Sequence, residues 1–313
     1  MPALRIFGRL GQPAFRSLIL SVAGNRRIQA IADRRGLEAG ADRFVAGESL
    51  DECIPVLQQL GSDGMRTYVI ALGEAVHTKE GAAEAARIYE ELIPAIAAER
   101  LNTTFSIKLT HLGLEVDREL ALRHALRIVS LAAKHSAFAR LDMEHSAVVD
   151  DTLAIYRALR SEGLDNTGTV LQAYLHRTMD DLINLLPLEP NVRVVKGAYL
   201  EPGTAALQRK DHVDVAYDQL ARTALTYAKF TAVATHDQRA IRVAADVALE
   251  QSSDFEFQML YGVRYALAQQ LVAAGQPVRI CVPFGQDWFV YFARRLAERP
   301  ANALFLLRNL GRR

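Results

Sequence analysis

Cysteine is scarce in this sequence, which has only Cys53 and Cys281 among 313 residues. Two thiols so far apart form neither a metal-binding spacing nor a disulfide framework, and such usage is typical of a reducing cytosol. No apolar run is long enough to span a bilayer, and the N-terminus lacks the hydrophobic stretch of a secretory signal. We therefore expect a cytoplasmic protein whose contact with a membrane, if any, is peripheral and at the inner face.

An excess of charge of one sign is also missing. The 37 basic and 36 acidic residues leave a net charge of +1, which provides no electrostatic footprint for nucleic acid. Half of the residues are hydrophobic and 23% are charged, as in ordinary globular proteins. The length allows one large domain or two of ordinary size, and no linker rich in proline, glycine or serine divides it.

Motifs of several enzyme classes are absent as well. No G-x-G-x-x-G follows the first predicted strand and no G-x-x-x-x-G-K-[ST] occurs, which weakens Rossmann and P-loop interpretations. No G-x-S-x-G or Cys/His pairing indicates acyl transfer. A single histidine, His236, ends a predicted strand without a second His or Cys beside it, so we predict no metal site.

Short β-type runs alternate with helical patterns through most of the chain. The runs predicted as strands are Thr67–Gly73, Phe105–Thr110, Arg140–Glu144, Thr169–Tyr174, Val192–Tyr199, Phe230–His236, Phe255–Leu260 and Val278–Val282. Apolar residues at helical spacing predict intervening helices that include Gly81–Ala98, Arg118–Lys134, Ala147–Ser161, Val213–Ala228 and Tyr265–Ala274. Such alternation implies right-handed βαβ units, and eight of them over about 230 residues fit a (βα)8 barrel better than an open sheet.

The first part of the chain has a different pattern. Apolar residues recur at helical spacing in Ala14–Ala23, Ile28–Arg35 and Leu50–Leu60, without strands between them. We predict a single structural domain overall, in which residues 1–62 form an N-terminal helical arm and residues 63–313 form the barrel with the functional site.

Polar residues near the predicted strand ends form the candidate site, because such barrels build their active sites at the C-terminal ends of the strands. These residues are Glu74, Lys108, Asp142, Glu144, Gln172, Tyr174, Arg193, Lys196, Tyr199, Thr235, His236 and Gln258. Each also has a purely structural interpretation, such as a core histidine, a core tyrosine, or a Lys108–Asp142 pair that fills the mouth. Acids and cations directed into one mouth, however, favour a ligand that offsets their desolvation.

A segment near the C-terminus contributes more cations. The run Val278–Val282 leads into an amphipathic segment in which Arg294 and Arg295 are adjacent and Glu298 lies one turn further on. Two guanidiniums can grip a small anion while the carboxylate holds them in place. Guanidiniums in aromatic surroundings need a partner of opposite charge, and a bound carboxylate is a natural one. Together with the strand-end lysines and arginine, the set suits an anionic substrate and a cofactor that carries phosphates.

Eight strings in this order resemble those of the proline dehydrogenase family, flavin enzymes that oxidise L-proline to Δ1-pyrroline-5-carboxylate. The strings are LGEAV (Leu72–Val76), SIKLT (Ser106–Thr110), LDME (Leu141–Glu144), LQAY (Leu171–Tyr174), VRVVKGAY (Val192–Tyr199), ATHD (Ala234–Asp237), FEFQMLYGVR (Phe255–Arg264) and VRICVPFG with YFARRLAERPAN. VRVVKGAY and ARRLAERPAN are highly specific. The resemblance covers every predicted strand and is to the monofunctional bacterial type.

This resemblance implies a fold and a cofactor. The family is a distorted (βα)8 TIM barrel that holds FAD non-covalently, with its last helix over the barrel mouth. The flavin accepts a hydride at N5, while the protein contributes orientation and charge. Proline's amine must lose a proton, and no histidine stands at the substrate end, so we expect deprotonation with solvent rather than by a dedicated base.

The resemblance also implies roles for individual residues. On the substrate side, Lys108, Arg294 and Arg295 would bind the proline carboxylate, Glu298 would orient them, Tyr199 and Leu260 would surround the ring, and Glu74 would pair with Arg294 to close the site. In catalysis, Arg193 would lie near flavin N5 and stabilise the reduced flavin, and Asp142 would support the arginines and the substrate end of the flavin. On the cofactor side, Gln172 would contact the isoalloxazine edge, and Lys196, Thr235 and His236 would reach the ribityl, pyrophosphate and adenosine portions.

Cys281 departs from the family pattern, in which a tyrosine commonly stands at this position and packs beside the substrate ring. The smaller Cys281 predicts a roomier pocket and weaker discrimination against hydroxyproline. A redox-sensitive thiol is a second interpretation, although nothing in the sequence indicates a lowered pKa for Cys281.

The resemblance further implies partners. A membrane quinone would accept the electrons, and a separate pyrroline-5-carboxylate dehydrogenase would take the product, because no aldehyde-dehydrogenase portion is present. The tail Ala301–Arg313 is apolar and then basic, a pattern that fits an interfacial contact or a packed terminal helix.

Two other functions fit the same residues. Barrel lyases present a strand-end lysine for a Schiff base, so Lys108 or Lys196 could serve while the arginines bind a carboxylate or phosphate. A flavin-binding or regulatory barrel would keep the cofactor without turnover. Borohydride trapping, flavin absorbance and its bleaching by proline distinguish these alternatives from the dehydrogenase.

Overall fold

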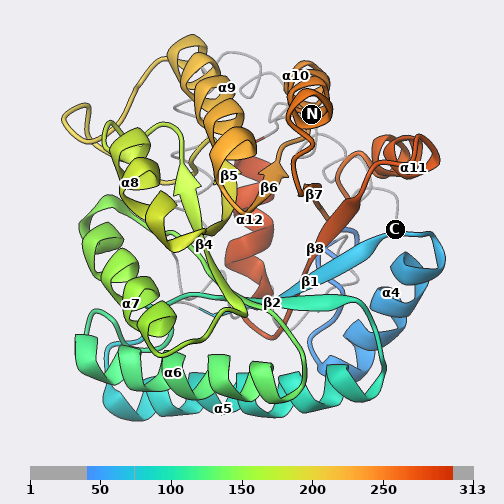
Figure 1. Ribbon diagram of the computed structural model, residues 1–313. Coiled ribbons are helices and arrows are strands. Elements are labelled where there is room, and N and C mark those ends of the chain that lie inside the picture. Colours follow the sequence, from blue (N-terminus) through green and yellow to red (C-terminus); the bar gives the residue numbers. More distant parts are fainter. Residues whose placement is uncertain (1–40, 74, 299–313) are drawn as a thin grey trace, which may run out of the picture.

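The computed structural model describes residues 41–73 and 75–298, with the backbone alone described for residues 294–298. In this part of the chain, eight parallel strands close into a barrel in sequence order (Figure 1). The strands are β1 (Arg66–Ala71), β2 (Thr103–Ile107), β3 (Ala139–Leu141), β4 (Thr167–Gln172), β5 (Asn191–Val195), β6 (Phe230–Ala234), β7 (Phe255–Leu260) and β8 (Val278–Phe284). The predicted (βα)8 TIM-type barrel is confirmed.

Helices cover the outside of the barrel between successive strands (Figure 1). They are α5 (Lys79–Ala98), α6 (Arg118–Lys134), α7 (Val149–Ser161), α8 (Thr178–Leu185), α9 (Lys210–Tyr227), α10 (Gln238–Gln251) and α11 (Tyr265–Ala273). Short 3-10 turns, η2 (Ser146–Val148) and η3 (Leu186–Leu188), precede α7 and follow α8. Side-chain caps explain several starts: the Asp117 carboxylate accepts from the backbone N–H groups of Glu119 and Leu120, and Asp237 accepts from that of Arg239.

The core fills the layer between the barrel and these helices. Tyr89, Tyr156 and Tyr217 project from helices and are fully buried, as are Phe105 and Phe257 from the strands. Because helices cover the barrel outside and side chains fill its inside, strands β4 and β8 are buried at every position. In the sequence β8 is accordingly a nearly continuous apolar run, whereas β4 also buries the polar residues Thr167, Thr169 and Gln172.

Several strands end earlier than the sequence predicts. The predicted runs Arg140–Glu144 and Val192–Tyr199 overlap β3 and β5, which stop at Leu141 and Val195. Beyond those points the chain leaves the barrel sheet to form the mouth loops. Strand β8 instead runs longer, because Pro283 pairs in register with Ile70 of β1 while its carbonyl accepts from Ala46 N–H.

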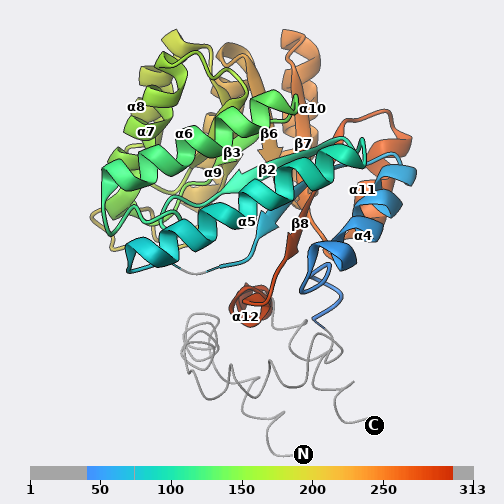
Figure 2. The same ribbon diagram turned by 90° about the horizontal axis from the view of Figure 1, so that it is seen from below.

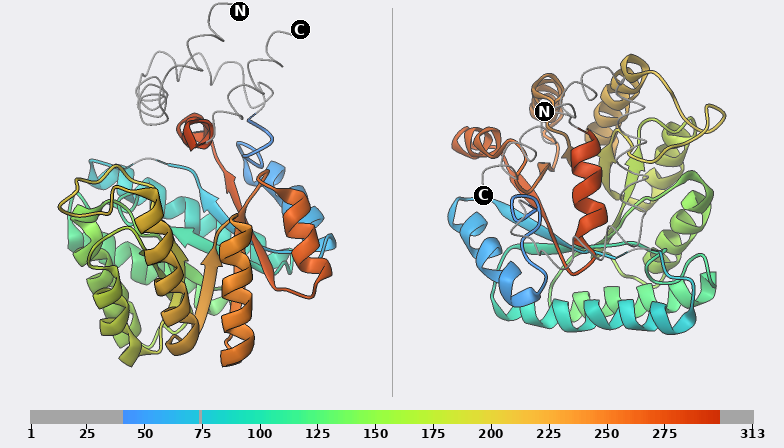
Figure 3. Two further views of the ribbon diagram at one scale, coloured as in Figure 1. Left: turned by 90° about the horizontal axis from the view of Figure 1, so that it is seen from above. Right: turned by 180° about the vertical axis from the view of Figure 1, so that it is seen from behind.

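Two helices depart from a simple alternation. Helix α4 (Leu50–Ser62) comes before the first strand and packs on β1 and β8, where it completes the outer ring. Helix α12 (Trp288–Glu298) follows β8 and lies across the end of the barrel at which the strands finish, outside the ring (Figures 2 and 3). The implied last helix over the mouth is therefore present.

Helix α12 is anchored by the segment that precedes α4. Trp288 and Phe292 pack in one apolar cluster with Phe44, Val45 and Leu72. The indole N–H of Trp288 donates to the Glu48 carboxylate at 3.0 Å. The lid-like helix is thus fixed by the stretch before α4 as well as by its connection to β8.

Some predictions fall on parts that the structure does not describe. The expected helices Ala14–Ala23 and Ile28–Arg35, the tail Ala301–Arg313 and Glu74 lie outside the described residues. The expected helix Leu50–Leu60 corresponds to α4. Among the described residues, no helix has the length and apolar character required to cross a membrane.

Candidate active site at the barrel mouth

A cavity of ≈ 920 Å³ lies where the strands end, and Tyr291 of α12 is among its lining residues. It is lined by every described residue that the sequence analysis assigned to substrate or cofactor. These residues are Lys108, Asp142, Gln172, Arg193, Lys196, Tyr199, Thr235, His236, Leu260 and Cys281. The side chains of Arg294, Arg295 and Glu298 lie outside the described residues, as does Glu74, although Tyr291 of α12 lines the same cavity.

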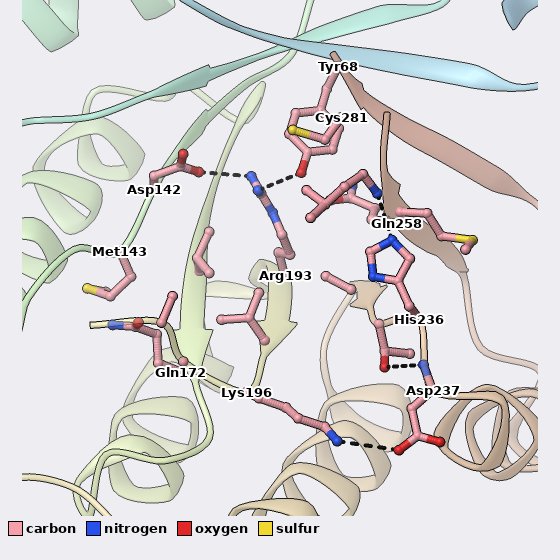
Figure 4. Close-up of a pocket in the computed structure, with 18 of the residues that line it drawn as sticks. Tyr68, Asp142, Met143, Gln172, Arg193, Lys196, His236, Asp237, Gln258 and Cys281 are labelled. Atoms are coloured by element: carbon pink, nitrogen blue, oxygen red, sulfur yellow. Dashed lines mark hydrogen bonds and ion pairs between the residues drawn. The ribbon is translucent and has the colours of Figure 1, made fainter. Parts of the chain in front are cut away.

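Arg193 of β5 stands at the centre of this cavity, between Asp142 and Tyr68 (Figure 4). Its Nη2 donates to Asp142 Oδ1 at 3.0 Å and to Ser106 Oγ at 2.9 Å, and its Nη1 donates to the Tyr68 hydroxyl at 3.1 Å. The guanidinium carbon also lies 4.7 Å from the centre of the Tyr68 ring. The terminal nitrogens are therefore held from three strands, β1, β2 and the end of β3.

The charge on Arg193 is stabilised although the residue is only 6% exposed. Burial opposes the charge, but Tyr68 and the Asp142 carboxylate outweigh it, and the pKa of the guanidinium is raised above its usual value. The Nε atom of Arg193 has no hydrogen-bond partner among the described residues and is buried. A buried N–H without an acceptor is costly, so this atom indicates a missing ligand.

Asp142 pairs with Arg193 rather than with Lys108. Its Oδ1 also accepts from Ser106 Oγ at 2.5 Å, and its backbone N–H donates to the Ile107 carbonyl at 2.8 Å. Lys108 makes no ion pair in the described part of the chain, and its ammonium donates to the Gly73 carbonyl at 3.4 Å. The structural interpretation of a Lys108–Asp142 pair is therefore wrong, and the ammonium at the mouth can serve an anion.

Lys196 lies at the opposite end of the cavity from Asp142 (Figure 4). Its ammonium contacts Asp214 of α9 at 2.5 Å and Asp237, the N-cap of α10, at 3.4 Å. Burial opposes ionisation of Asp214, but its bonds to Lys196 and Lys210 outweigh burial and lower the pKa. Further cations line this end, namely Lys210, Arg239, Arg242 and Arg264. A helix N-terminus among several cations is suited to phosphate groups.

Thr235 and His236 follow β6 at the same end. The Thr235 hydroxyl accepts from Asp237 N–H at 3.1 Å, which fixes the turn into α10. His236 Nε2 accepts from Leu260 N–H at 3.0 Å, so this ring nitrogen carries no proton in this arrangement. The histidine therefore joins the ends of β6 and β7.

Gln172 is oriented from the end of β3. Its Nε2 donates to the Glu144 carbonyl at 2.8 Å, and the buried Glu144 carboxylate accepts from Thr110 N–H at 3.0 Å and from its hydroxyl at 2.7 Å. Burial raises the pKa of Glu144 even though Thr110 counteracts it. The LDME string thus contributes both Asp142, which lines the cavity, and Glu144, which joins three mouth loops.

The loop after β5 depends on Gly197. This residue has φ +116°, and a Cβ built there would lie 2.2 Å from the Tyr174 ring. Only glycine satisfies both the conformation and the close approach. The turn carries the chain to Tyr199, which lines the cavity and lies edge-on to His145 with ring centroids 6.3 Å apart.

Sequence reasoning missed several residues of this site. Tyr68 and Ser106 lie within strands rather than after them, at positions two residues before Ile70 and Lys108, and the strand period of two was the available signal. Asp214 lies on a helix and gives no strand-end signal. In the described part of the chain, no group of three His, Cys, Asp or Glu residues is placed to hold a metal ion.

Comparison with known proteins gives consistent matches along the chain. The family model described as proline dehydrogenase matches residues 53–308. Proline dehydrogenase 1 of Bacillus subtilis (strain 168) is 38% identical over 298 residues, which cover 94% of this chain and 98% of the relative. The proline dehydrogenase of Deinococcus radiodurans is 40% identical over 303 residues, which cover 95% and 97% of the two chains.

A solved structure supports the fold. The crystal structure of proline utilization A (PutA) from Bdellovibrio bacteriovorus, inactivated by N-propargylglycine, matches with a TM-score of 0.79 at 24% sequence identity. The match covers 91% of this chain and 36% of that one, so this chain corresponds to a minor part of PutA. By its family model and its full-length relatives, this chain belongs to the proline dehydrogenase family and is an oxidoreductase.

Proposed function

We propose that this protein binds FAD non-covalently in the mouth cavity, oxidises L-proline to Δ1-pyrroline-5-carboxylate, and passes the electrons to a quinone. This is the first step of proline catabolism. Membership of the family supports the reaction. The observation that carries the assignment of the cofactor is the buried Arg193 Nε–H, which finds no acceptor among the described residues and belongs to a residue that lines a cavity of ≈ 920 Å³.

The residues present fit a flavin dinucleotide at both ends of the cavity. The Arg193 Nε–H would donate to the bound flavin, and Gln172 lines the same cavity. Lys196 and the start of α10 provide cations and N–H groups for phosphates. When bound, FAD supplies the hydride acceptor.

The chain's own residues would position the substrate. Lys108, together with Arg294 and Arg295, would bind the proline carboxylate, with Glu298 orienting the arginines and Glu74 closing over them. Tyr199 and Leu260 would enclose the ring. Such a clamp on the carboxylate holds the reacting carbon in place, which lowers the entropic part of the barrier. Arg193 would hold positive charge beside the reacting atoms, with Asp142 fixing its orientation.

Removal of the amine proton would fall to solvent. His236 is the histidine that lines the cavity in the described part of the chain, and its Nε2 is engaged by Leu260 N–H. A group held in this way is poorly placed to accept a proton from substrate. A pH profile of kcat/KM that follows a histidine and disappears in one histidine variant would contradict this.

The product and electrons would leave by separate routes. Reduction of a membrane quinone would require the protein to associate peripherally with the inner face of the membrane. A separate pyrroline-5-carboxylate dehydrogenase would take the product. Reconstitution with quinone-containing vesicles tests the first of these routes by following quinone reduction after addition of L-proline.

An absorbance spectrum of the purified protein, before and after anaerobic L-proline, tests the proposed function directly. We expect a yellow protein whose flavin bands bleach on addition of proline. A colourless protein that cannot be reconstituted with FAD would refute it. Covalent trapping of substrate on Lys108 or Lys196 by borohydride would instead support a Schiff-base lyase, and a yellow protein that does not bleach would indicate a flavin-binding barrel without turnover.

A further inference from the structure

Tyr68 of β1 reaches into the cavity from a strand that lies between two of the assigned substrate positions. Strand β1 pairs with β2, which precedes Lys108, and with β8, which carries Cys281. Tyr68 and Cys281 are direct partners in the register of β1 and β8. Both side chains line the cavity, and Figure 4 shows them side by side.

The ring of Tyr68 takes up space that the small Cys281 side chain leaves. Tyr68, Ile70 and Cys281 form one buried apolar cluster, against which Leu260 packs. Tyr68 is 5% exposed and Cys281 is 1% exposed, so this part of the wall is tightly packed. The largest apolar surface in the cluster is the phenol ring.

The Tyr68 ring is also held in one orientation. Its hydroxyl accepts from Arg193 Nη1 at 3.1 Å, and the guanidinium carbon lies 4.7 Å from the ring centre. A phenol that is bonded at its tip and stacked on a cation has little freedom to swing aside. A small molecule that sits between Arg193 and Lys108 therefore meets a rigid aromatic wall.

We propose that Tyr68 is a specificity-determining residue whose ring limits the ring size of the bound imino acid, and that its hydroxyl holds Arg193 in place. The inference rests on the proposed function, since it concerns the substrate of that site. It also revises the expectation of a roomier pocket, which was based on Cys281 alone. Here the aromatic side chain of the wall is Tyr68 on β1, whereas the family pattern has a tyrosine on β8. A pocket closed in this way favours a five-membered ring over a six-membered one.

Binding of two unreactive carboxylates tests the proposal without turnover. Cyclopentanecarboxylate and cyclohexanecarboxylate are titrated by calorimetry into the FAD-loaded wild type and its variants, and the ratio of the two dissociation constants is compared. In the wild type the smaller ring binds more tightly. In Tyr68→Val the ratio of the two dissociation constants changes about tenfold in favour of cyclohexanecarboxylate, as expected for one methylene in an apolar pocket. Tyr68→Phe keeps the ring and hence the ratio.

A rescue and a control make the test specific. The double variant Tyr68→Val/Cys281→Tyr returns an aromatic ring from the neighbouring strand and restores the preference for the smaller carboxylate. Tyr156→Phe removes a hydroxyl that accepts from Arg160 Nη1 away from the cavity, and it leaves the ratio of the two dissociation constants unchanged. If Tyr68→Val binds both carboxylates with the wild-type ratio, the proposal is wrong.

The role of the Tyr68 hydroxyl is tested separately, by steady-state kinetics. Tyr68→Phe leaves Arg193 Nη1 without its acceptor, so we expect kcat for L-proline to fall about tenfold while KM changes less than about twofold. Unchanged kcat in Tyr68→Phe would overturn the role of the hydroxyl in holding Arg193. Failure of the proposed function would look different, because then neither carboxylate binds the wild type and L-proline does not bleach its flavin. That result would also remove the basis for assigning Tyr68.

Discussion

Asp142 and Arg193 form the central ion pair of the cavity, with Oδ1 3.0 Å from Nη2 and both side chains largely removed from water. The pair joins the end of β3 to β5 across the barrel mouth. Because a buried guanidinium needs a carboxylate nearby, the position of Asp142 decides how Arg193 is presented to a ligand. Ser106 and Tyr68 complete the set of contacts.

We predict that Asp142→Asn lowers kcat by at least about tenfold, because Arg193 loses its compensating charge and its fixed orientation. Single-turnover reduction of the flavin by L-proline measures the effect. Asp181→Asn is the matched control, since Asp181 is also buried and also bonds an arginine, Arg177 of the helix α8 region, outside the cavity. Equal losses in both variants would contradict a role specific to the site.

Substitutions of the lysines at the two ends of the cavity should affect different steps, substrate binding at Lys108 and FAD binding at Lys196. We predict that Lys108→Ala raises KM for L-proline about tenfold and leaves FAD bound, because one cation of a carboxylate clamp is lost. Arg294→Met or Arg295→Met should raise KM further. Steady-state kinetics at saturating FAD provides the measurement.

We predict the reverse for Lys196→Met, in which FAD should dissociate about tenfold more readily while KM at saturating FAD is unchanged. Dissociation of FAD is followed by recovery of flavin fluorescence on dilution. If Lys108→Ala releases FAD and Lys196→Met raises KM, the two ends of the cavity have been assigned the wrong way round.

Gly197→Ala should destabilise the mouth loop, because the new Cβ meets the Tyr174 ring at 2.2 Å in a backbone conformation with φ +116°. The conformation alone costs about 1–3 kcal/mol for a residue other than glycine. Gly163→Ala is the control, since Gly163 has φ +76° and open space around it. Thermal unfolding should show a larger loss for Gly197→Ala, accompanied by weaker FAD binding; equal losses would remove the argument from close packing.

The stability of the fold should fall as the pH drops from about 6.5 to about 4 because of His111. Burial lowers the pKa of His111 from 6.5 to about 4, with Lys108 adding to the effect. The unfolded chain then binds a proton in this range that the folded chain does not, so stability is full above pH 6.5 and is lost toward pH 4. The loss amounts to about 3 kcal/mol, and urea unfolding of the wild type and His111→Gln at pH 7 and pH 5 should show a flatter dependence in the variant.

Much of the fold could be predicted from the sequence, because most strands contain short β-type runs that alternate with helical patterns. Helix Arg118–Lys134 has the predicted bounds, since Asp117 caps it and a polar stretch follows. The helical ranges predicted from the sequence did not include α8 or α10. Strand ends were less predictable: the predicted run Val192–Tyr199 extends past Val195, where β5 ends and the mouth loop begins.

The candidate site was predictable where its residues follow a strand, as Lys108, Lys196 and His236 do. For Tyr68 and Ser106, the strand period of two places them on the same face as Ile70 and Lys108, but within a strand the sequence does not distinguish a residue that fills the barrel from one that reaches the mouth. The Lys196 partner Asp214 could not be singled out either, since it lies on α9, the helix that follows β5, and a helix residue gives no strand-end signal.

The outer ring is complete without α12, because α4 occupies the place between β8 and β1 that a final helix would otherwise take. The helix over the mouth is instead secured by a small separate cluster around Trp288 and Phe44. Local opening needs only the contacts of the segment that opens, so this cluster can give way at a lower free energy than the barrel. Gentle heating should therefore inactivate the enzyme reversibly, with its strands intact, well before the polypeptide melts.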